Sequence, residues 1–277
     1  MARSIRSFHE RQVIPLAQIL CSTGALIGMP NGRNYRLLET FAPQLDCDGF
    51  EFMMYETWYD QVPALLSYLT GLRLPFPVMH ADKGIGELIS LGEPEAFRRF
   101  ELNCDIARHI GANKVVLHLW NGLTSDSRID ENLAAYGRLR AIAADRGLDL
   151  LVENVLCSHQ DPLTHWQSLR ERYPNVHFIF DTKMAHFHRQ LDQFYASDFD
   201  VRHYHVNDHA GALMDWKSLR TLPLGAGEID FDAFFAHIRR TGYSGTFTVE
   251  ATAFDRSGNV DLDMLNRCFS RIRASLS

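Results

Sequence analysis

Eight short apolar runs alternate along this chain with longer segments of helical periodicity. The runs lie at residues 14–21, 48–54, 76–80, 114–119, 149–155, 177–181, 201–206 and 245–251. Strand-length runs that alternate with helices are typical of βαβ units, whose strands are parallel. Five of the runs, the third to sixth and the eighth, are almost continuously apolar, as in strands that are covered on both faces. The pattern therefore predicts an α/β fold built on a parallel sheet.

The segments between the runs have the spacing of amphipathic helices. In residues 94–111, apolar side chains fall at positions 97, 100, 102, 106, 107 and 110. This segment and residues 132–147 and 231–245 each end on a glycine, which favours a helix C-cap. Eight such units in 277 residues predict a (β/α)₈ TIM barrel that forms a single domain over residues 1–277. An open doubly wound sheet is the competing architecture, but STGALIG at 22–28 lacks the glycine spacing of a dinucleotide-binding turn.

Composition and charge narrow the class of protein. Asp and Glu number 34 against 28 Lys and Arg, so the net charge of −6 offers no general attraction to nucleic acid or anionic membranes. The beginning MARSIRSFHERQ is polar, and no apolar stretch is long enough to span a bilayer. Five scattered cysteines without a CxxC pair favour a reducing compartment. We expect a cytoplasmic protein without nucleic-acid or membrane partners, and self-association stays open.

Potential metal ligands stand at or near the ends of six of the apolar runs. The carboxyl ends of the strands of a barrel form one rim, where active sites lie. We therefore expect these side chains to surround one cavity. They are His80, His118, Glu153, Asp181, a histidine of the seventh run and Glu250.

Glu153 and Glu250 are the strongest candidates, because a carboxylate inside an apolar strand is costly to bury unless it is paired, protonated or bound to metal. Asp181 follows the same logic, although it could instead cap the next helix. His203 and His205 share one face of their strand, so alternation does not choose between them. Oxygen and imidazole ligands suit Mn²⁺, Zn²⁺, Co²⁺, Fe²⁺ or Mg²⁺. Such an ion would stabilise an enediolate while the two glutamates move protons.

The ordered motifs of the chain resemble those of the xylose isomerase-like barrels, which include sugar phosphate isomerases and epimerases and the type IV apurinic endonucleases. The resemblance spans residues 14–272. Its motifs are DGFE, VMHAD, VVLHLWNG, LLVENV, FDTKMAH, HVND, LGAGEIDF and GYSGTFTVEA. The HxxD pattern of this superfamily falls on His205 and Asp208, which selects His205 as the strand-seven ligand.

The resemblance implies that Glu153, Asp181, His205 and Glu250 are the metal ligands. It also implies that the two glutamates are the acid and base of an isomerase or epimerase acting on a sugar, sugar phosphate or polyol. His80 and His118 match positions that hold an additional metal in the endonucleases or contact substrate in other members. A site with two metals and Glu153 between them stays open.

The chain departs from the superfamily at two places. Met184 stands where a DxxH histidine is common, and the stretch SLRTLPLGAG lacks the aspartate and histidine that complete the three-metal site of the endonucleases. These departures disfavour a phosphodiesterase that cleaves abasic DNA. They leave Lys183 as a replacement substrate contact, beside Asp208 and Trp120. A dehydratase-like lyase acting on a polyol or keto-sugar stays open, as does a barrel that binds a sugar without catalysis.

Overall fold

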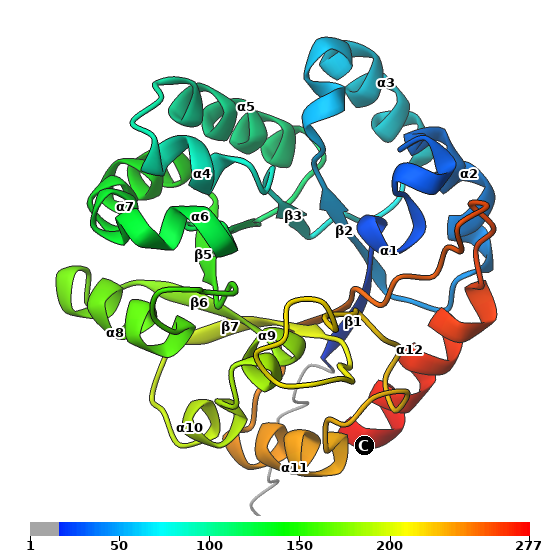
Figure 1. Ribbon diagram of the computed structural model, residues 1–277. Coiled ribbons are helices and arrows are strands. Elements are labelled where there is room, and N and C mark those ends of the chain that lie inside the picture. Colours follow the sequence, from blue (N-terminus) through cyan, green and yellow to red (C-terminus); the bar gives the residue numbers. More distant parts are fainter. Residues whose placement is uncertain (1–16) are drawn as a thin grey trace, which may run out of the picture.

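The computed structural model describes residues 17–277, apart from the side chains of residues 123 and 124. Eight parallel strands pair in sequence order, and the last pairs with the first, which closes a barrel (Figure 1). The predicted (β/α)₈ fold is therefore confirmed. Residues 14–16 of the first predicted strand lie outside the described residues. The strands are β1 Gln18–Ser22, β2 Gly49–Met53, β3 Val78–His80, β4 Lys114–Leu117, β5 Asp149–Glu153, β6 His177–Asp181, β7 Val201–Val206 and β8 Thr246–Val249.

Helices surround the barrel on its outer side (Figure 1). The longer ones are α3 Val62–Leu72, α5 Glu95–His109, α7 Ile129–Ala144, α8 Pro162–Arg172, α11 Phe231–Thr241 and α12 Leu262–Leu276. The shorter ones are α1 Thr23–Leu26, α2 Leu38–Phe41, α4 Ile85–Ser90, α6 Gly122–Ser125, α9 Thr182–Phe187 and α10 Leu191–Tyr195. Single turns of 3₁₀ helix occur at η1 Met29–Asn31, η2 Tyr35–Leu37, η3 Ala42–Gln44 and η5 Asp126–Arg128, and a longer one at η4 Glu56–Gln61. No described helix has the length and apolar content needed to cross a membrane.

A glycine lies at or shortly after the end of each of the three helices that the periodicity singled out. Gly111 and Gly147 have φ of +81° and +70°, the left-handed conformation that a side chain disfavours. They follow helices that end two and three residues earlier, at His109 and Ala144. The third helix ends earlier than predicted: α11 stops at Thr241 and Gly242, with φ of +67°, is its cap. Residue 245, the predicted end, instead directly precedes β8.

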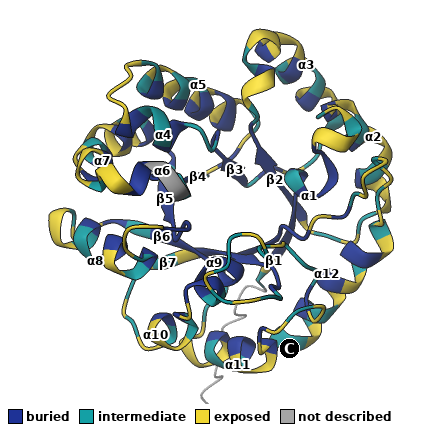
Figure 2. Ribbon diagram, in the orientation of Figure 1, coloured by how far each residue is buried: buried dark blue, intermediate teal, exposed yellow. Residues whose placement is uncertain are grey.

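The barrel interior is divided between apolar and polar side chains. The outward-facing strand residues pack with the helices into the main core. In Figure 2 this core includes the strands and the dark blue sides of the helices that face them. Inside the barrel, five aliphatic side chains form a separate cluster: Leu20, Val78, Val116, Leu151 and Ile179. Strands β2, β7 and β8 instead place Glu51, His203 and Thr248 there, all fully buried and hydrogen-bonded to one another. A barrel of this class usually fills its interior with branched apolar residues, so this polar part needs a separate explanation.

Candidate metal centre

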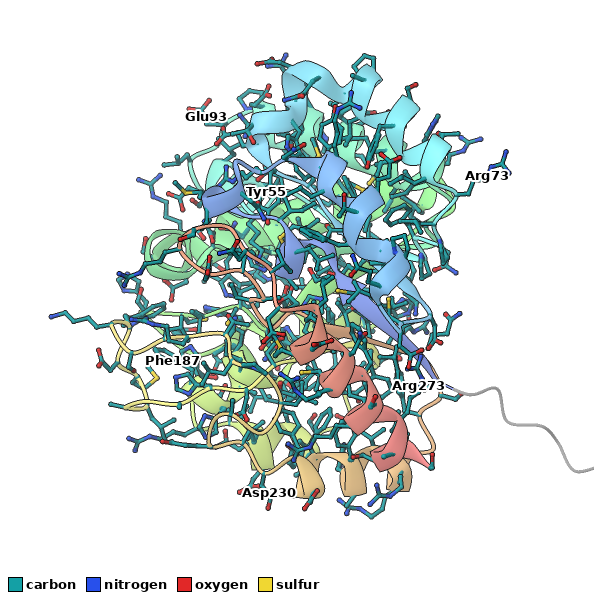
Figure 3. All side chains as sticks on the ribbon, turned by 90° about the vertical axis from the view of Figure 1, so that its right-hand side faces the viewer. Tyr55, Arg73, Glu93, Phe187, Asp230 and Arg273 are labelled. Carbon is teal, nitrogen blue, oxygen red and sulfur yellow. The ribbon has the colours of Figure 1, made fainter. Side chains whose placement is uncertain are left out.

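The predicted ligands meet at one rim of the barrel. Figure 3 shows the molecule from the side, with Tyr55 and Phe187, which follow β2 and β6, toward one end, and Arg73 and Arg273 toward the other. The rim on the Tyr55 side is therefore formed by the carboxyl ends of the strands. All six side chains are buried, with at most 9% exposed: His80, His118, Glu153, Asp181, His205 and Glu250.

Three carboxylates converge on one nitrogen of His205. Its Nδ1 atom lies 3.3 Å from Oε1 of Glu153, 3.6 Å from Oε2 of Glu250 and 4.0 Å from Oδ2 of Asp181. One potential ligand atom from each of these four residues lies within 4.8 Å of those of the others. The structure thus brings together the four residues that the sequence predicts as ligands, from the ends of the four consecutive strands β5 to β8.

The other nitrogen of His205 fixes how the ring is protonated. Nε2 lies 2.9 and 3.0 Å from the two oxygens of Glu51. An ionised carboxylate only accepts hydrogen bonds, so Nε2 carries a proton. A neutral imidazole would then direct its Nδ1 lone pair at three carboxylates, an arrangement that requires a cation, either a proton or a metal ion. Burial alone would lower the pKa of His205, but Glu250, Glu51 and Glu153 raise it well above its ordinary value.

Glu153 also belongs to a second group of potential ligands. Its Oε2 atom lies 2.9 Å from Nε2 of His118 and 3.2 Å from Nε2 of His80. Since Nδ1 of His80 is 2.8 Å from the carbonyl oxygen of Ala81, which can only accept, Nδ1 holds the proton of the neutral ring. The Nε2 lone pair would then face Glu153, so this contact too calls for a cation. Burial opposes ionisation of Glu153, but His118 and His205 hold its pKa well below the ordinary value.

Several polar atoms of this centre are buried without a hydrogen-bond partner among the described residues. They are both ring nitrogens of His118 and Oε1 of Glu250. The contact between His118 and Glu153 is short but lacks hydrogen-bond geometry. Burial lowers the pKa of His118 to about 4, so its ring is neutral near pH 7 and has a lone pair to offer. Buried polar atoms in proteins are rarely left unsatisfied, so these atoms point to a bound species.

Asn207 links two of the carboxylate ligands. Its side-chain Nδ2 donates to Oδ2 of Asp181 at 3.1 Å, and its Oδ1 accepts from the backbone N of Glu250 at 2.8 Å. Asp181 also caps α9, because its Oδ1 accepts from the backbone N of Met184 at 2.8 Å. Asp181 therefore caps a helix, as the sequence suggested, and also belongs to the group of candidate ligands.

Two ionisable residues near the centre, Glu51 and Lys83, are absent from the set predicted from the sequence. Glu51 lies within an apolar run just as Glu153 does, so the cost of burying its carboxylate was a usable signal. Lys83 follows β3, and nothing in its sequence neighbourhood distinguishes it from a solvated lysine. Burial would lower the pKa of Lys83, but the charges of Glu250 and Glu153 raise it above its ordinary value. It brings a positive charge to the carboxylates.

The three remaining predicted contacts are buried. The ring of Trp120 has no exposed surface, and its Nε1 donates to the carbonyl of Val155 at 3.0 Å. The Nζ of Lys183, which is 7% exposed, donates to Oγ1 of Thr221 at 2.9 Å. For these two residues the hydrogen bonds support a role in holding the loops of the rim.

Asp208 holds the loop that follows β7. Its Oδ2 accepts from the backbone N of Gly225 at 2.8 Å and of Gly227 at 2.9 Å. A Cβ atom on Gly227 would lie 2.4 Å from Oδ1 of Asp208, so only glycine fits there. Because these two amides are engaged by Asp208, they are not available to cradle a phosphate.

A family model described as "Xylose isomerase-like TIM barrel" matches residues 40–267 of the chain. This range covers most of the 277 residues. The chain belongs to the xylose isomerase-like TIM barrel family. No curated protein sequence matches it.

Solved structures of similar fold come from sugar epimerases and a zinc-containing protein. An L-ribulose 3-epimerase has a TM-score of 0.69 and 17% identity over 94% of this chain and 95% of its own. D-Allulose 3-epimerase from Methylomonas sp., in complex with D-allulose, has a TM-score of 0.66 and 15% identity over 94% and 98%. The IOLI protein with a zinc atom has a TM-score of 0.68 and 15% identity over 94% and 98%. At these identities the likeness shows the shared fold.

Met184 stands in this xylose isomerase-like barrel where the DxxH pattern would place a histidine. The side chain is 7% exposed and packs in a small apolar cluster with Leu156 and Phe187, against Trp216 and Leu219. The cluster ties the segment after β6 to the loop after β7. Met184 therefore contributes packing at the rim.

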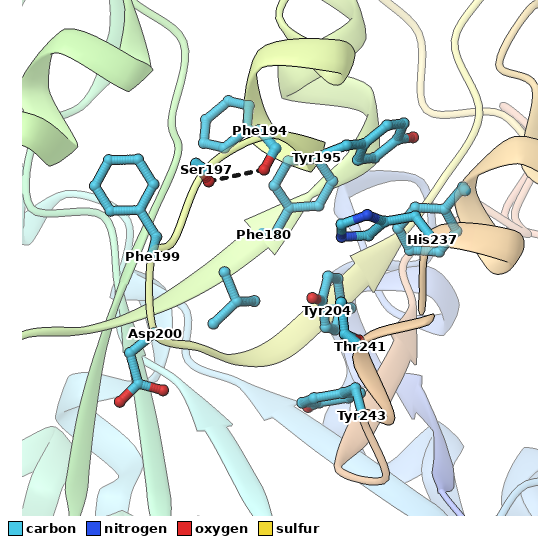
Figure 4. Close-up of a pocket in the computed structure, with 12 residues that line it drawn as sticks. Phe180, Phe194, Tyr195, Ser197, Phe199, Asp200, Tyr204, His237, Thr241 and Tyr243 are labelled. Carbon is cyan, nitrogen blue, oxygen red and sulfur yellow. Dashed lines mark hydrogen bonds between the residues drawn. The ribbon is translucent and has the colours of Figure 1, made fainter. Parts of the chain in front are cut away.

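The candidate metal centre is separate from an aromatic cavity on the outer side of the barrel. This cavity of about 270 Å³ lies between α10 and α11, over Phe180 of β6 and Tyr204 of β7 (Figure 4). His237 is also part of its wall. None of the candidate ligands lines it. The candidate ligands therefore lie apart from this cavity.

Proposed function

We propose that this chain is a divalent-metal-dependent isomerase or epimerase of a sugar or polyol, which works by proton transfer next to a carbonyl group. The observation that carries the proposal is the convergence of Glu153 and Glu250 on Nδ1 of His205, while Oε1 of Glu250 has no partner among the described residues. One buried carboxylate oxygen at the rim thus lacks a partner, which a bound substrate would supply.

The side chains fit a divalent cation. Glu153, Asp181, His205 and Glu250 would hold it, since they offer three carboxylates and one imidazole nitrogen around a common space. The two lone-pair conflicts, at Nδ1 of His205 and Nε2 of His80, favour positive charge there. His80, His118 and Glu153 would form a second site, with Glu153 shared by both groups. When bound, the cation stabilises negative charge that develops on the substrate oxygens.

Glu250 is the better placed proton acceptor. Burial opposes its ionisation, but His205 and Lys83 lower its pKa below the ordinary value, so it is a carboxylate near pH 7. Its free Oε1 can take a proton from the carbon beside the carbonyl. Glu153 comes from β5, three strands away in the barrel order, and is the candidate that returns a proton to the opposite face of that carbon when configuration inverts.

The likeness to sugar epimerases agrees with this chemistry. One of these neighbours was solved with D-allulose and another neighbour with zinc, which are a ketose and a divalent metal of the classes proposed for this chain. The positive charge of Lys83 beside Glu250 and Glu153 is a candidate partner for a substrate oxygen. No described feature favours cleavage of DNA over this reaction.

Proton transfer can be detected without knowing the substrate in advance. The full chain, loaded with Mn²⁺ or Zn²⁺, is incubated in D₂O with a panel of ketoses and polyol-derived ketones, and NMR follows deuterium at the carbon next to the carbonyl. We expect deuterium incorporation with at least one sugar. Glu250→Gln should lower that rate by about 10² to 10⁴-fold, the usual value of a general base.

Glu93→Gln is the matched control, because Glu93 is an exposed carboxylate that belongs to neither ligand group. It should exchange at the wild-type rate. If Glu250→Gln exchanged as fast as the wild type on the same sugar, Glu250 would not be the base. If no sugar exchanged with the metal-loaded protein, the proposed class of reaction would be wrong.

A further inference from the structure

Glu51 receives three hydrogen-bond donors inside the barrel. Nε2 of His205 lies 2.9 and 3.0 Å from its two oxygens, and Nε2 of His203 lies 2.8 Å from Oε2. The hydroxyl of Thr248 donates to the same Oε2 at 2.8 Å. The side chain of Glu51 is fully buried, so these contacts replace water entirely.

The proton positions in this network follow from its outer members. Lys114 can only donate, and its Nζ lies 2.9 Å from Oγ1 of Thr246. The Thr246 hydroxyl, 2.5 Å from Nδ1 of His203, then donates its own proton to that nitrogen. His203 therefore carries its proton on Nε2 and donates it to Glu51. Each donor in this series of hydrogen bonds has an acceptor. Glu51 is therefore held by His203 on one side and by His205 on the other.

A buried carboxylate at this level of the barrel is costly. The other strands fill the same interior with Leu20, Val78, Val116, Leu151 and Ile179, which need no hydrogen bonds. An ionised group away from water loses several kcal/mol of solvation, and a set of apolar side chains packs as well at lower cost. The fold alone does not account for the carboxylate, whereas its contact with His205 gives it a role at the rim.

We propose that Glu51 is a positioning residue of the metal centre: it holds the Nε2 proton of His205 and thereby turns the Nδ1 lone pair toward Glu153, Asp181 and Glu250. His203 and Thr248 hold Glu51 in place. The inference rests on the proposed function, because the orientation matters only if Nδ1 binds a cation. Carboxylates that accept from the remote nitrogen of a ligating histidine fix its tautomer and make it a stronger ligand.

The test compares metal affinity with folding stability. In Glu51→Gln the amide NH₂ would face the Nε2 donor of His205 in either orientation, because Nε2 lies 2.9 and 3.0 Å from the two oxygens of Glu51. The contact with His205 is therefore disturbed at nearly constant volume. Calorimetric titration of the metal-stripped full chain with Mn²⁺ or Zn²⁺ should show 10- to 100-fold weaker binding at the His205 site. In the Zn²⁺-bound protein, long-range ¹H–¹⁵N NMR should show His205 protonated at Nε2 alone in the wild type, and a changed protonation pattern in the variant.

Further variants separate positioning from general destabilisation. Thr248→Val removes one of the contacts that hold Glu51 in place and leaves the contact with His205, so its metal affinity should lie between those of the wild type and Glu51→Gln. Asp126→Asn changes another buried carboxylate, which accepts from the backbone of Ser158 and His159. It should lower the melting temperature without changing metal affinity at the His205 site. Glu51→Asp, which keeps the charge but shortens the side chain, should bind metal between the wild type and Glu51→Gln.

Three results would overturn the inference, and only the last would also overturn the proposed function. If the wild type binds metal and Glu51→Gln binds it equally well, Glu51 is a structural residue, and the proposed function stands. If Glu51→Gln only lowers the melting temperature and keeps the His205 tautomer, the same conclusion follows. If the wild type itself binds no divalent metal, the proposed function fails and the positioning role fails with it.

Discussion

At the scale of single residues, His205 connects the two kinds of carboxylate in this barrel. Its Nε2 atom donates to Glu51 on the interior side, and its Nδ1 atom faces Glu153, Glu250 and Asp181 at the rim. In the metal-free state a proton on Nδ1 balances part of this negative charge. A metal ion must take the place of that proton, because both need the same lone pair.

Metal affinity should therefore rise with pH. The pKa of His205 is raised well above its ordinary value, so near pH 7 the metal-free ring is protonated and binding releases the proton. Burial also raises the pKa of Asp181 to about 6, so a second proton is displaced below that pH. One released proton corresponds to about tenfold in affinity per pH unit.

Calorimetric titrations at pH 7 in buffers of different ionisation enthalpy measure the number of protons released. A positive number, and an apparent Kd that falls between pH 6 and 8, are expected. A Kd that is constant over this range, with no proton release, would contradict the protonation state assigned to His205.

Much of the site could be predicted from residue type and strand position, but not all of it. Glu153 and Glu250 were recognisable because a carboxylate is costly inside an apolar strand. The choice of His205 over His203 could not come from alternation, since both point inward and both contact Glu51 through Nε2. Their Nδ1 atoms differ: that of His205 faces Glu153 and Glu250, and that of His203 contacts the hydroxyl of Thr246. Lys83 lies in a polar loop, and only the fold brings its charge to Glu250.

At the scale of elements, the ends of the strands depend on the helices packed behind them. Asn132 of α7 donates to the carbonyl oxygens of Gly86 and Leu119 at 2.7 and 2.6 Å, which ties α4 to the end of β4. Gly86 lies so close to this strand end that a Cβ atom would stand 2.5 Å from the carbonyl oxygen of His118. The position of His118 thus depends on a helix residue that has no side chain.

Gly86→Ala should destabilise the protein by about 1–3 kcal/mol, because backbone atoms must shift to admit the methyl group. Gly71→Ala is the matched control, since Gly71 also lies in a helix, α3, and a Cβ atom there meets nothing within 4 Å. It should be neutral or stabilise by about 0.5–1 kcal/mol, the ordinary gain in helix propensity. Urea unfolding measures both. Equal effects of the two substitutions would show that α4 does not constrain the end of β4.

Strand bounds came out within a few residues of those predicted, because the apolar runs are short. The helix bounds were less accurate. The end of α11 was placed at Gly245, whereas Gly242 takes the left-handed conformation that ends it. Gly242 and Gly245 both satisfy the rule that a glycine follows the end of a helix. Only the start of β8 at Thr246 decides between them.

At the scale of the whole molecule, the closed barrel brings residues distant in sequence into one charged cluster. Glu51 and His205 are 154 residues apart, and Glu51 and Thr248 are 197 apart, yet both pairs are hydrogen-bonded. One part of the barrel interior is an ordinary apolar cluster, and the part lined by β2, β7 and β8 supports the rim with a buried polar network. The fold class was predictable from periodicity. The division of the barrel interior into an apolar and a polar part was not, since it depends on which strands become neighbours.

The central claim is that Glu153, Asp181, His205 and Glu250 hold one divalent metal ion. Anomalous diffraction from crystals grown with Mn²⁺ or Zn²⁺ tests it directly, because it locates the ion independently of any activity. The account predicts a peak about 2.0–2.2 Å from one oxygen of each carboxylate and from Nδ1 of His205, the usual distances for such ligands. A peak bound only by other residues, or no peak in metal-containing crystals, would contradict it.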